Sequence, residues 1–271
     1  MSTAEAAQDT ESEQRTAIYV YGIVPADVEP APHATGIGDP PSEIAVVRHG
    51  EIAALVSEIT LGRPLGTPDD LTAHARLLDG TAAVAPVLPL RFGGVVSDTE
   101  AVDKELLAAG YDDFHAALNE LEGRAQFVIR ARYTENAILR EILDENPQAA
   151  QLREEIRDKP EDATRNERIA LGEIVNQAIE SKRAGDTRRL AAALQDLDPM
   201  VRQRPPTHEE EAAHLAILVE LSRQDDLEQA LAELGEEWEQ RVELSLLGPM
   251  APYDFVTARA PDEAPERPPE G

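Results

Sequence analysis

Two histidines in the second half of the chain are the first candidates for chemistry, because imidazole nitrogens bind transition metals. They stand six positions apart, at His208 and His214, with three glutamates between them. A zinc-protease motif needs its histidines four positions apart on one helix face. Six helical steps turn through about 600°, so the two rings would diverge by about 120°. We therefore interpret this segment as a polar approach to a strand.

Most other catalytic signatures are missing from the sequence. There is no cysteine, which excludes thiolate metal sites and Cys nucleophiles. Neither a phosphate-binding G-x-x-x-x-G-K-[ST] loop nor a G-x-S-x-G nucleophile elbow occurs. The segment Gly36-Ile-Gly38 begins like a dinucleotide fingerprint but continues into two prolines, which indicates a loop. The sequence thus predicts no catalytic residue, no metal and no cofactor, and we expect a protein that is not an enzyme.

Two single residues could serve either a ligand or the core. His74 lies on a predicted helix, and we interpret it as a half-buried histidine with satisfied polar atoms. Arg91 stands between Leu90 and Phe92 in an apolar strand. Burying a guanidinium requires a carboxylate partner, so Arg91 is predicted to form a structural ion pair rather than a ligand clamp.

The charge balance excludes whole classes of partner. Lys and Arg number 25 and Asp and Glu 53, a net charge of 25 − 53 = −28, which would repel DNA, RNA and anionic lipid. The longest apolar run, residues 82–90, contains two prolines and is far shorter than the roughly 20 residues of a membrane span. The acidic first fifteen residues are unlike a signal peptide. We expect a cytoplasmic protein with no nucleic-acid or membrane partner.

Hydrophobic periodicity predicts the elements of the first half. The strands are expected at Thr16–Val24, at Ile44–Val47 and Ile52–Val56 as a hairpin turning at Gly50, and at Val87–Phe92. One helix is capped by Thr67, and its predicted buried stripe consists of Leu71, Ala75, Leu78 and Ala82. A second helix runs from Asp98 to Gly123 with an apolar face at steps of three and four.

The second half is predicted to alternate strands and helices. The expected strands are Gln126–Tyr133, residues 213–221, and residues 242–246 ended by Gly248-Pro249; the expected helices begin near Ile138 and near Asp225. Between Pro147 and Pro206 the sequence is highly charged with sparse apolar steps, which indicates a solvated helical hairpin.

Together these elements predict an α+β protein of two domains. We expect an acidic disordered head over 1–15, a first α+β domain over 16–123 and a second domain over 124–256. The second is predicted to be a modified ferredoxin-like unit with an inserted charged helical hairpin at about 147–206. The Pro- and Glu-rich residues 257–271 are expected to be a disordered tail.

Three segments taken in order resemble one protein family. They are Tyr19-Val-Tyr-Gly-Ile-Val24, Pro86-Val-Leu-Pro-Leu-Arg-Phe-Gly93, and Leu247-Gly-Pro-Met-Ala-Pro-Tyr-Asp-Phe-Val256. This set is similar to the gas vesicle protein GvpF/GvpL family, over roughly residues 17 to 256, with His74 at the family's histidine position. Met250-Ala251 stands where the family usually has Trp-Pro. The resemblance marks these motif positions as candidate interaction residues: Tyr19, Tyr21, Gly22, His74, Pro89, Arg91, Phe92, Gly93, Gly248, Pro249, Pro252, Tyr253 and Phe255.

The resemblance implies a non-enzymatic accessory protein of gas vesicle assembly, located in the cytoplasm with the vesicles. Its implied partners are the hydrophobic shell protein and other gas vesicle accessory proteins. It would limit shell-protein aggregation during nucleation, or remain as a minor vesicle component. We expect the first domain to provide the shell contact; a purely structural role for the motif strands is the alternative. Two other readings stay open, a generic acidic adaptor and a carboxylate-dependent hydrolase.

The acidic composition also indicates the conditions in which the protein works. Only three of the 25 cations are lysines, and the acids are spread over the whole chain. This pattern is typical of adaptation to high salt, where the Debye length falls to about 3 Å at 1 M. We therefore predict a halophilic source.

Overall fold

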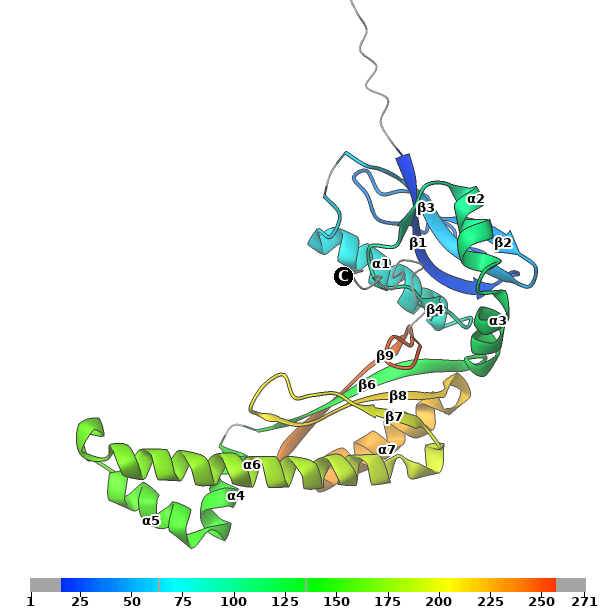
Figure 1. Cartoon of the computed structure of the whole chain (residues 1–271). Helices are drawn as coiled ribbons and strands as arrows, with labels where there is room; N and C mark the ends of the chain where they lie inside the picture. Colours follow the sequence, from blue (N-terminus) through cyan, green and yellow to red (C-terminus); the bar gives the residue numbers. More distant parts are fainter. Residues whose placement is uncertain (1–15, 63, 135, 257–271) are drawn as a thin grey trace, which may run out of the picture. The chain divides into compact units, whose positions relative to one another are not determined.

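The computed structural model describes residues 16–62, 64–134 and 136–256 (Figure 1). The chain forms two compact units that divide between Glu122 and Gly123, and Val256 belongs with the first. Each unit combines helices with one antiparallel sheet, which confirms the predicted α+β class. Independent folding of each unit, with the domain limits expected above, stays a prediction. The expected head and tail lie outside the described residues.

The first unit is built on a sheet with β1 at its centre. Its strands are β1 (Thr16–Pro25), β2 (Ala45–His49), β3 (Ile52–Thr60), β4 (Leu88–Pro89) and β5 (Val95–Val96), in the order β2-β3-β1-β4 with β5 also on β1. β1 is buried along almost its whole length because it is covered on both faces and paired on both edges. The predicted hairpin is present, and Gly50 at its turn has φ +57°.

Helix α1 (Pro68–Ala82) begins as predicted but buries a different face. Thr67 and Asp70 form a reciprocal capping box at its start. The buried residues include Asp70, His74 and Leu78, whereas Leu71 is 48% exposed. The predicted stripe was therefore right for Leu78 and Ala82 and wrong for Leu71 and Ala75, because the Asp70 carboxylate turns inward to accept backbone hydrogen bonds.

The long helix predicted after Asp98 is interrupted. It consists of α2 (Thr99–Ala101), a π-helical segment η1 (Val102–Leu107) and α3 (Tyr111–Glu120), with Gly110 at the break. Asp98 caps the start by accepting from the Ala101 N–H at 2.8 Å. The apolar face still reaches the core, because Leu107 and Leu118 are buried.

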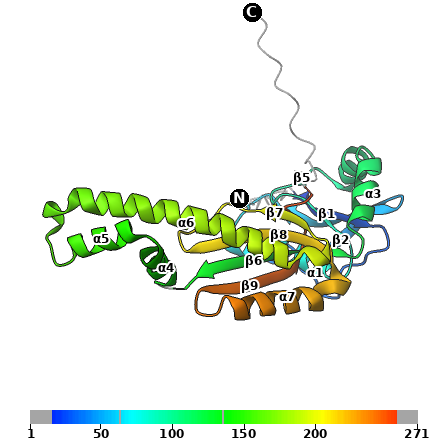
Figure 2. The ribbon, with the colours of Figure 1, turned by 90° about the horizontal axis from the view of Figure 1, so that it is seen from below.

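The second unit has the strand order of a ferredoxin-like fold. Its strands are β6 (Arg124–Tyr133), β7 (Met200–Gln203), β8 (Glu211–Glu220) and β9 (Val242–Met250), in the order β7-β8-β6-β9. Its helices are α4 (Ala137–Glu145), α5 (Pro147–Ile156), α6 (Arg165–Ala193) and α7 (Gln224–Glu237). Helices link β6 to β7 and β8 to β9, giving the β-α-β-β-α-β pattern. Figures 1 and 2 agree that α6 and α7 cover one face of this sheet.

Helix α6 contributes both to the core and to a helical extension, which consists of α4, α5 and the first half of α6. Near its end, Leu190 is fully buried in the core with Phe127 and Trp238. Its earlier turns run beyond the sheet beside α5 (Figure 1), and Ile169 there is 52% exposed. The expected helical hairpin is thus present as α5 and the first half of α6, which pack side by side, whereas the second half of α6 belongs to the core.

Two boundaries in the second unit differ from the sequence-based expectation. The strand β7 lies inside the segment expected to be entirely helical. All four of its residues are exposed, so the sequence has no apolar alternation there that would predict a strand. β9 continues through Gly248-Pro249 instead of ending there. The peptide between these two residues is cis, the register with β6 shifts beside them, and Met250 still pairs with Gln126.

Candidate functional site

Five of the predicted motif residues of the first half converge in one cluster. Tyr19 and Tyr21 of β1 are fully buried, and His74 of α1 is 4% exposed. The Tyr19 hydroxyl hydrogen-bonds His74 Nδ1 at 2.9 Å and accepts from the Gly93 N–H at 3.1 Å. The Phe92 ring lies 5.6 Å from that of Tyr19 and 5.5 Å from that of His74. We define Tyr19, Tyr21, His74, Phe92 and Gly93 as the aromatic cluster.

A second set of hydrogen bonds ties a surface loop to this cluster. The Tyr21 hydroxyl hydrogen-bonds Ser57 Oγ at 2.8 Å and accepts from the Ile37 N–H at 2.8 Å. The Asp70 carboxylate accepts from the N–H groups of Gly38 and Gly66 at 3.3 and 3.2 Å. The Gly-rich segment that imitates a dinucleotide fingerprint is therefore a loop, as predicted, and its backbone is fixed by tyrosine and aspartate.

Gly22 is required by close backbone approach. It pairs with Pro89 of β4, and a Cβ at this position would lie 2.7 Å from the Leu88 carbonyl oxygen and 2.9 Å from the Leu78 side chain. Any side chain would push β4 or α1 away from β1. The Tyr19–Val24 motif and the Pro86–Gly93 motif are therefore in direct contact.

Burial sets the protonation states in the aromatic cluster. Desolvation raises the pKa of Tyr19 and of Tyr21 above the ordinary phenol range, and it lowers the pKa of His74. All three side chains are therefore neutral near pH 7. Neutral and enclosed, they are suited to holding β1, α1 and the 91–94 turn together, and none is exposed enough to touch a large partner.

The prediction for Arg91 was wrong. β4 ends at Pro89, the Leu90 N–H donates to the Tyr21 carbonyl, and the chain then turns at Gly93 with φ +102°. Arg91 is exposed on this turn and makes no ion pair within the described part of the chain. A strand two residues long leaves the guanidinium in solvent, so it needs no buried partner.

The third motif folds back onto the start of β6. Gly248 has φ +140°, and a Cβ there would meet the Phe127 ring at 2.7 Å. The following turn places Asp254 against Gln126: the Asp254 N–H donates to Gln126 Oε1 at 3.0 Å, and Gln126 Nε2 donates to the Asp254 carboxylate at 2.6 Å. Pro252 is buried, whereas Tyr253 is 37% exposed and Phe255 half-buried. Pro249 is the cis proline of β9.

Three polar residues of this region were missed by the sequence reasoning. Arg204 Nε donates to the Asp254 carboxylate at 3.0 Å, so Gln126, Arg204 and Asp254 form one network. The sequence does mark Gln126 as unusual, since it is a lone amide in an otherwise apolar run. Arg204 gave none, because its partner is 50 residues away in sequence.

The two histidines of the apparent metal pattern do not come together. His208 is exposed in the turn before β8, whereas His214 lies within β8 and is 5% exposed. Across residues 16–62, 64–134 and 136–256, no three His, Asp or Glu side chains gather as a metal site. The same residues include no helix long and apolar enough to cross a membrane.

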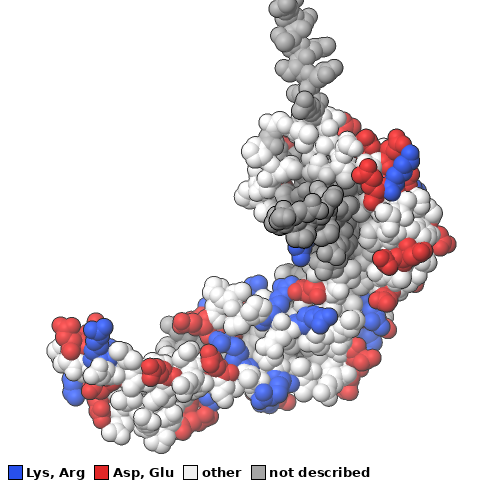
Figure 3. Space-filling view, viewed as in Figure 1, with Lys and Arg blue, Asp and Glu red and all other residues white. Residues whose placement is uncertain are grey.

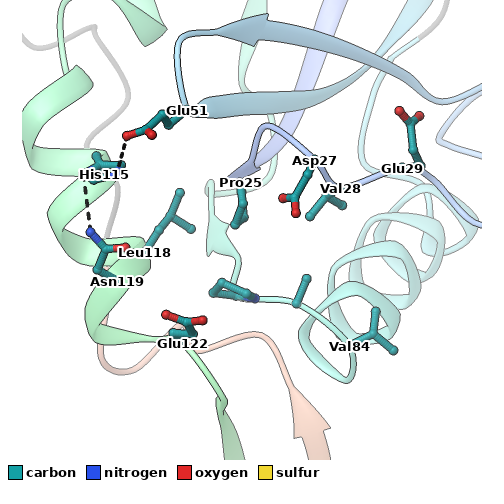
Figure 4. A pocket seen from close by; sticks show the side chains of 12 residues that line it. Pro25, Asp27, Val28, Glu29, Glu51, Val84, His115, Leu118, Asn119 and Glu122 are labelled. Atoms are coloured by element: carbon teal, nitrogen blue, oxygen red, sulfur yellow. Dashed lines mark hydrogen bonds and ion pairs between the residues drawn. The ribbon is translucent and has the colours of Figure 1, made fainter.

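A cavity of about 560 Å³ opens in the first unit, away from the aromatic cluster (Figure 4). Carboxylates of Asp27, Glu29, Glu51 and Glu122 surround apolar Leu118 and other residues. In Figure 4, the His115 ring lies between Glu51 and Asn119, and its Nε2 is 3.2 Å from the Glu51 carboxylate. An apolar floor with an acidic rim suits a side chain with an apolar stem and a cationic tip.

A second hollow of the same unit is more apolar. It has a volume of about 430 Å³ and lies between the 38–43 loop and the end of β3. Its lining includes Pro40, Pro41, Ile59 and Leu65, and the adjacent Leu61 is 53% exposed. We call this hollow with Leu61 the apolar groove.

Comparison with known proteins finds one family whose sequences and structures match most of this chain. The family model described as "Gas vesicle synthesis protein GvpL/GvpF" matches residues 17–257. Gas vesicle protein F of Streptomyces sp. (strain CB03234) is 33% identical over 240 residues, covering 88% of this chain and 98% of that protein. The crystal structure of GvpF from Anabaena sp. PCC7120 superposes with a TM-score of 0.76 at 21% identity, covering 90% of this chain and 99% of that one. GvpF from Microcystis aeruginosa gives 0.68 at 20% identity, with 88% and 98% covered.

The α+β fold, the ordered motifs and these matches define a gas vesicle protein. More particularly, the chain belongs to the GvpL/GvpF family, as the resemblance of its three motifs predicted. The family match extends over both compact units, so it does not rest on one shared motif.

Proposed function

We propose that the protein is a non-enzymatic accessory factor of gas vesicle assembly that binds the hydrophobic shell protein and limits its aggregation during nucleation. The observation that carries this proposal is the family match over residues 17–257. In this proposal the protein also contacts other accessory proteins of the gas vesicle. A cytoplasmic location beside the growing vesicle follows from the role.

The first unit offers the surface that suits such a contact. A shell subunit that has not yet polymerised exposes apolar surface, and a second apolar surface can cover it. The apolar groove supplies one, and Leu61 stands exposed beside it. The net charge of −28 would keep the complex soluble while the shell subunit is held.

The motif residues support this contact indirectly. Tyr21 fixes the Ile37 N–H and Asp70 fixes the Gly38 N–H, so the loop that forms one wall of the groove is held by the aromatic cluster and α1. In this proposal the motifs shape the contact surface and do not touch the partner themselves.

The test uses the full chain and compares two exposed apolar residues. Leu61 is 53% exposed beside the groove, and Ile169 is 52% exposed on α6 of the other unit. We expect Leu61→Glu to reduce capture of purified shell protein about tenfold or more, and Ile169→Glu to leave it unchanged. Light scattering of the shell protein should show the same order: the wild-type chain and Ile169→Glu delay aggregation, and Leu61→Glu does not.

Two results would change the proposal. Loss of capture in Ile169→Glu alone would move the contact to the helical extension. If the wild type and both variants captured the shell protein fully and protected it equally from aggregation, the apolar groove would not be the contact surface. Washing floated vesicles and probing them for the chain separates a transient factor, absent after washing, from a minor wall component, which stays.

A further inference from the structure

One face of the second unit's sheet carries arginines, and the described helices α6 and α7 of that unit pack on the other face. The core side of β6 holds Phe127 and Ile129, which pack on α6 and α7, so the alternate residues point to the opposite face. On that face Arg130 of β6 lies opposite His214 of β8, and Arg202 of β7 lies opposite Ala216 of β8. The Arg204 N–H donates to the His214 carbonyl, which continues the row. We call Arg130, Arg202 and Arg204 the arginine face.

The local charge is opposite to that of the molecule. β6 contains three arginines and no acid, and residues 200–204 contain two arginines and no acid. Over the whole chain, acids exceed bases by 53 to 25. In the view of Figure 3, Lys and Arg lie mixed with Asp and Glu over the second unit, whereas Asp and Glu predominate on the visible face of the first unit.

The chain itself shows which chemistry this face accepts. The Asp254 carboxylate lies on it and accepts from Arg204 and from Gln126. Arg132, at the end of β6, is likewise paired with Glu210. Arg130 and Arg202 are exposed and have no carboxylate partner within the described ranges of the second unit. Two guanidinium groups therefore remain available beside an occupied one, and carboxylates are their natural ligands.

Apolar residues flank the free arginines. Met200 precedes Arg202 on β7 and is 46% exposed, and Leu247 of β9, opposite Val128, is 64% exposed. β7 is also an edge strand, so its outer backbone groups are open to pairing. A segment that matches this surface has carboxylates next to apolar side chains.

We propose that the arginine face binds an acidic segment of a protein partner, with Glu or Asp on Arg130 and Arg202 and apolar side chains on Met200 and Leu247. A short segment fits this face better than a nucleic acid or an anionic bilayer. Those polyanions extend past the face and meet the surrounding carboxylates, whereas a short segment lies within about one Debye length, roughly 8 Å, of the arginines. The inference is independent of the proposed shell contact, which lies on the other unit.

The test measures peptide binding to the full chain by fluorescence anisotropy at about 0.15 M salt. The probe is a fluorescein-labelled synthetic peptide of Glu, Leu and Ser, and its partner probe has Gln in place of every Glu. We expect the Glu peptide to bind at least about tenfold more tightly than the Gln peptide. Arg130→Glu with Arg202→Glu should lower that affinity about tenfold or more, and Arg130→Gln with Arg202→Gln should lower it less.

The matched control reverses two exposed arginines elsewhere on the same unit, Arg153→Glu with Arg188→Glu, which changes the net charge equally. It should alter the affinity less than about twofold. Equal loss in both double variants, equal binding of the two peptides, or no binding of the Glu peptide would overturn the proposal. So would tighter binding of a labelled RNA oligonucleotide or of phosphatidylserine vesicles, or self-association of the chain through Arg130 and Arg202. Circular dichroism checks that all variants fold.

Discussion

At the scale of single residues, the Tyr19 hydroxyl shows how a family motif can be structural. It joins three segments that are distant in sequence: β1, helix α1 through His74, and the turn at Gly93. Such a buried hydroxyl is costly to remove, because the buried His74 Nδ1 would lose its hydrogen bond without gaining one from water. The hypothesis that the strand motifs contact the partner is therefore weaker for Tyr19, Tyr21 and His74 than for exposed neighbours.

We predict that Tyr19→Phe lowers the free energy of unfolding by about 1 to 3 kcal/mol, since His74 Nδ1 and the Gly93 N–H are left unpaired. Urea denaturation measures the change. Tyr111→Phe is the control: the Tyr111 hydroxyl accepts one exposed N–H, that of Glu51 at 3.3 Å, and its loss should cost less than about 0.5 kcal/mol. Equal costs for the two variants would contradict a structural role for the Tyr19 hydroxyl.

At the scale of elements, charged side chains tie the helical extension to the sheet. Glu141 of α4 accepts from Lys182 of α6 at 2.5 Å and from Arg241, just before β9, at 2.7 Å. Asp186 of α6 accepts from Arg241 at 2.9 Å and from the Tyr133 hydroxyl at 2.7 Å. This network determines the position of α4 and α6 against the end of the sheet. Hydrophobic patterning alone does not specify that position.

The network predicts a pH dependence. Burial opposes ionisation of Glu141, but the hydrogen bonds from Arg241 and Lys182 outweigh it, and its pKa is lowered below the usual 4.5. The unfolded chain therefore takes up this proton at a higher pH than the folded chain, so the stabilisation is complete above about pH 4.5 and is lost as the pH falls through the lowered pKa.

We expect Glu141→Gln to lower the free energy of unfolding at pH 7 by about 1 to 2 kcal/mol. The difference from the wild type should shrink as the pH falls below 4.5, because protonated Glu141 resembles Gln. Chemical denaturation at several pH values measures it. Glu180→Gln, on an exposed position of α6, is the control and should show no such trend. A constant difference at every pH would exclude Glu141 as the titrating group.

At the scale of the whole molecule, the charge of −28 acts on both units at once. Repulsion among 53 acids destabilises the compact state, and salt weakens it by shortening the Debye length from about 10 Å at 0.1 M to about 3 Å at 1 M. The predicted halophilic source stays a prediction that this effect addresses.

We predict that the thermal midpoint, followed by circular dichroism, rises as KCl increases from about 0.1 M to about 1 M. NaCl at equal ionic strength should have the same effect if screening is the cause. A midpoint that does not change with salt would assign the acidic composition to solubility alone, and the scarcity of lysine to codon usage.

The sequence by itself determined the elements that have a clear hydrophobic period and the order of the family motifs. Strands β1, β3, β6 and β8 and helix α7 lie where their patterns predicted, because each buries a continuous apolar run or an apolar face. Strand β7, whose residues are all exposed, and the fragment β4 had no such period and were missed or overextended.

Only the tertiary structure decided which motif residues meet and which remain on the surface. His74 faces Tyr19 across 55 residues, and Gln126 faces Asp254 across 128, because strand register and helix packing bring them together. Strand register also places Arg130 and Arg202 on one face, whereas the early end of β4 leaves Arg91 in solvent. Local patterns report how each segment is buried, whereas contacts between distant segments depend on how the buried faces fit one another.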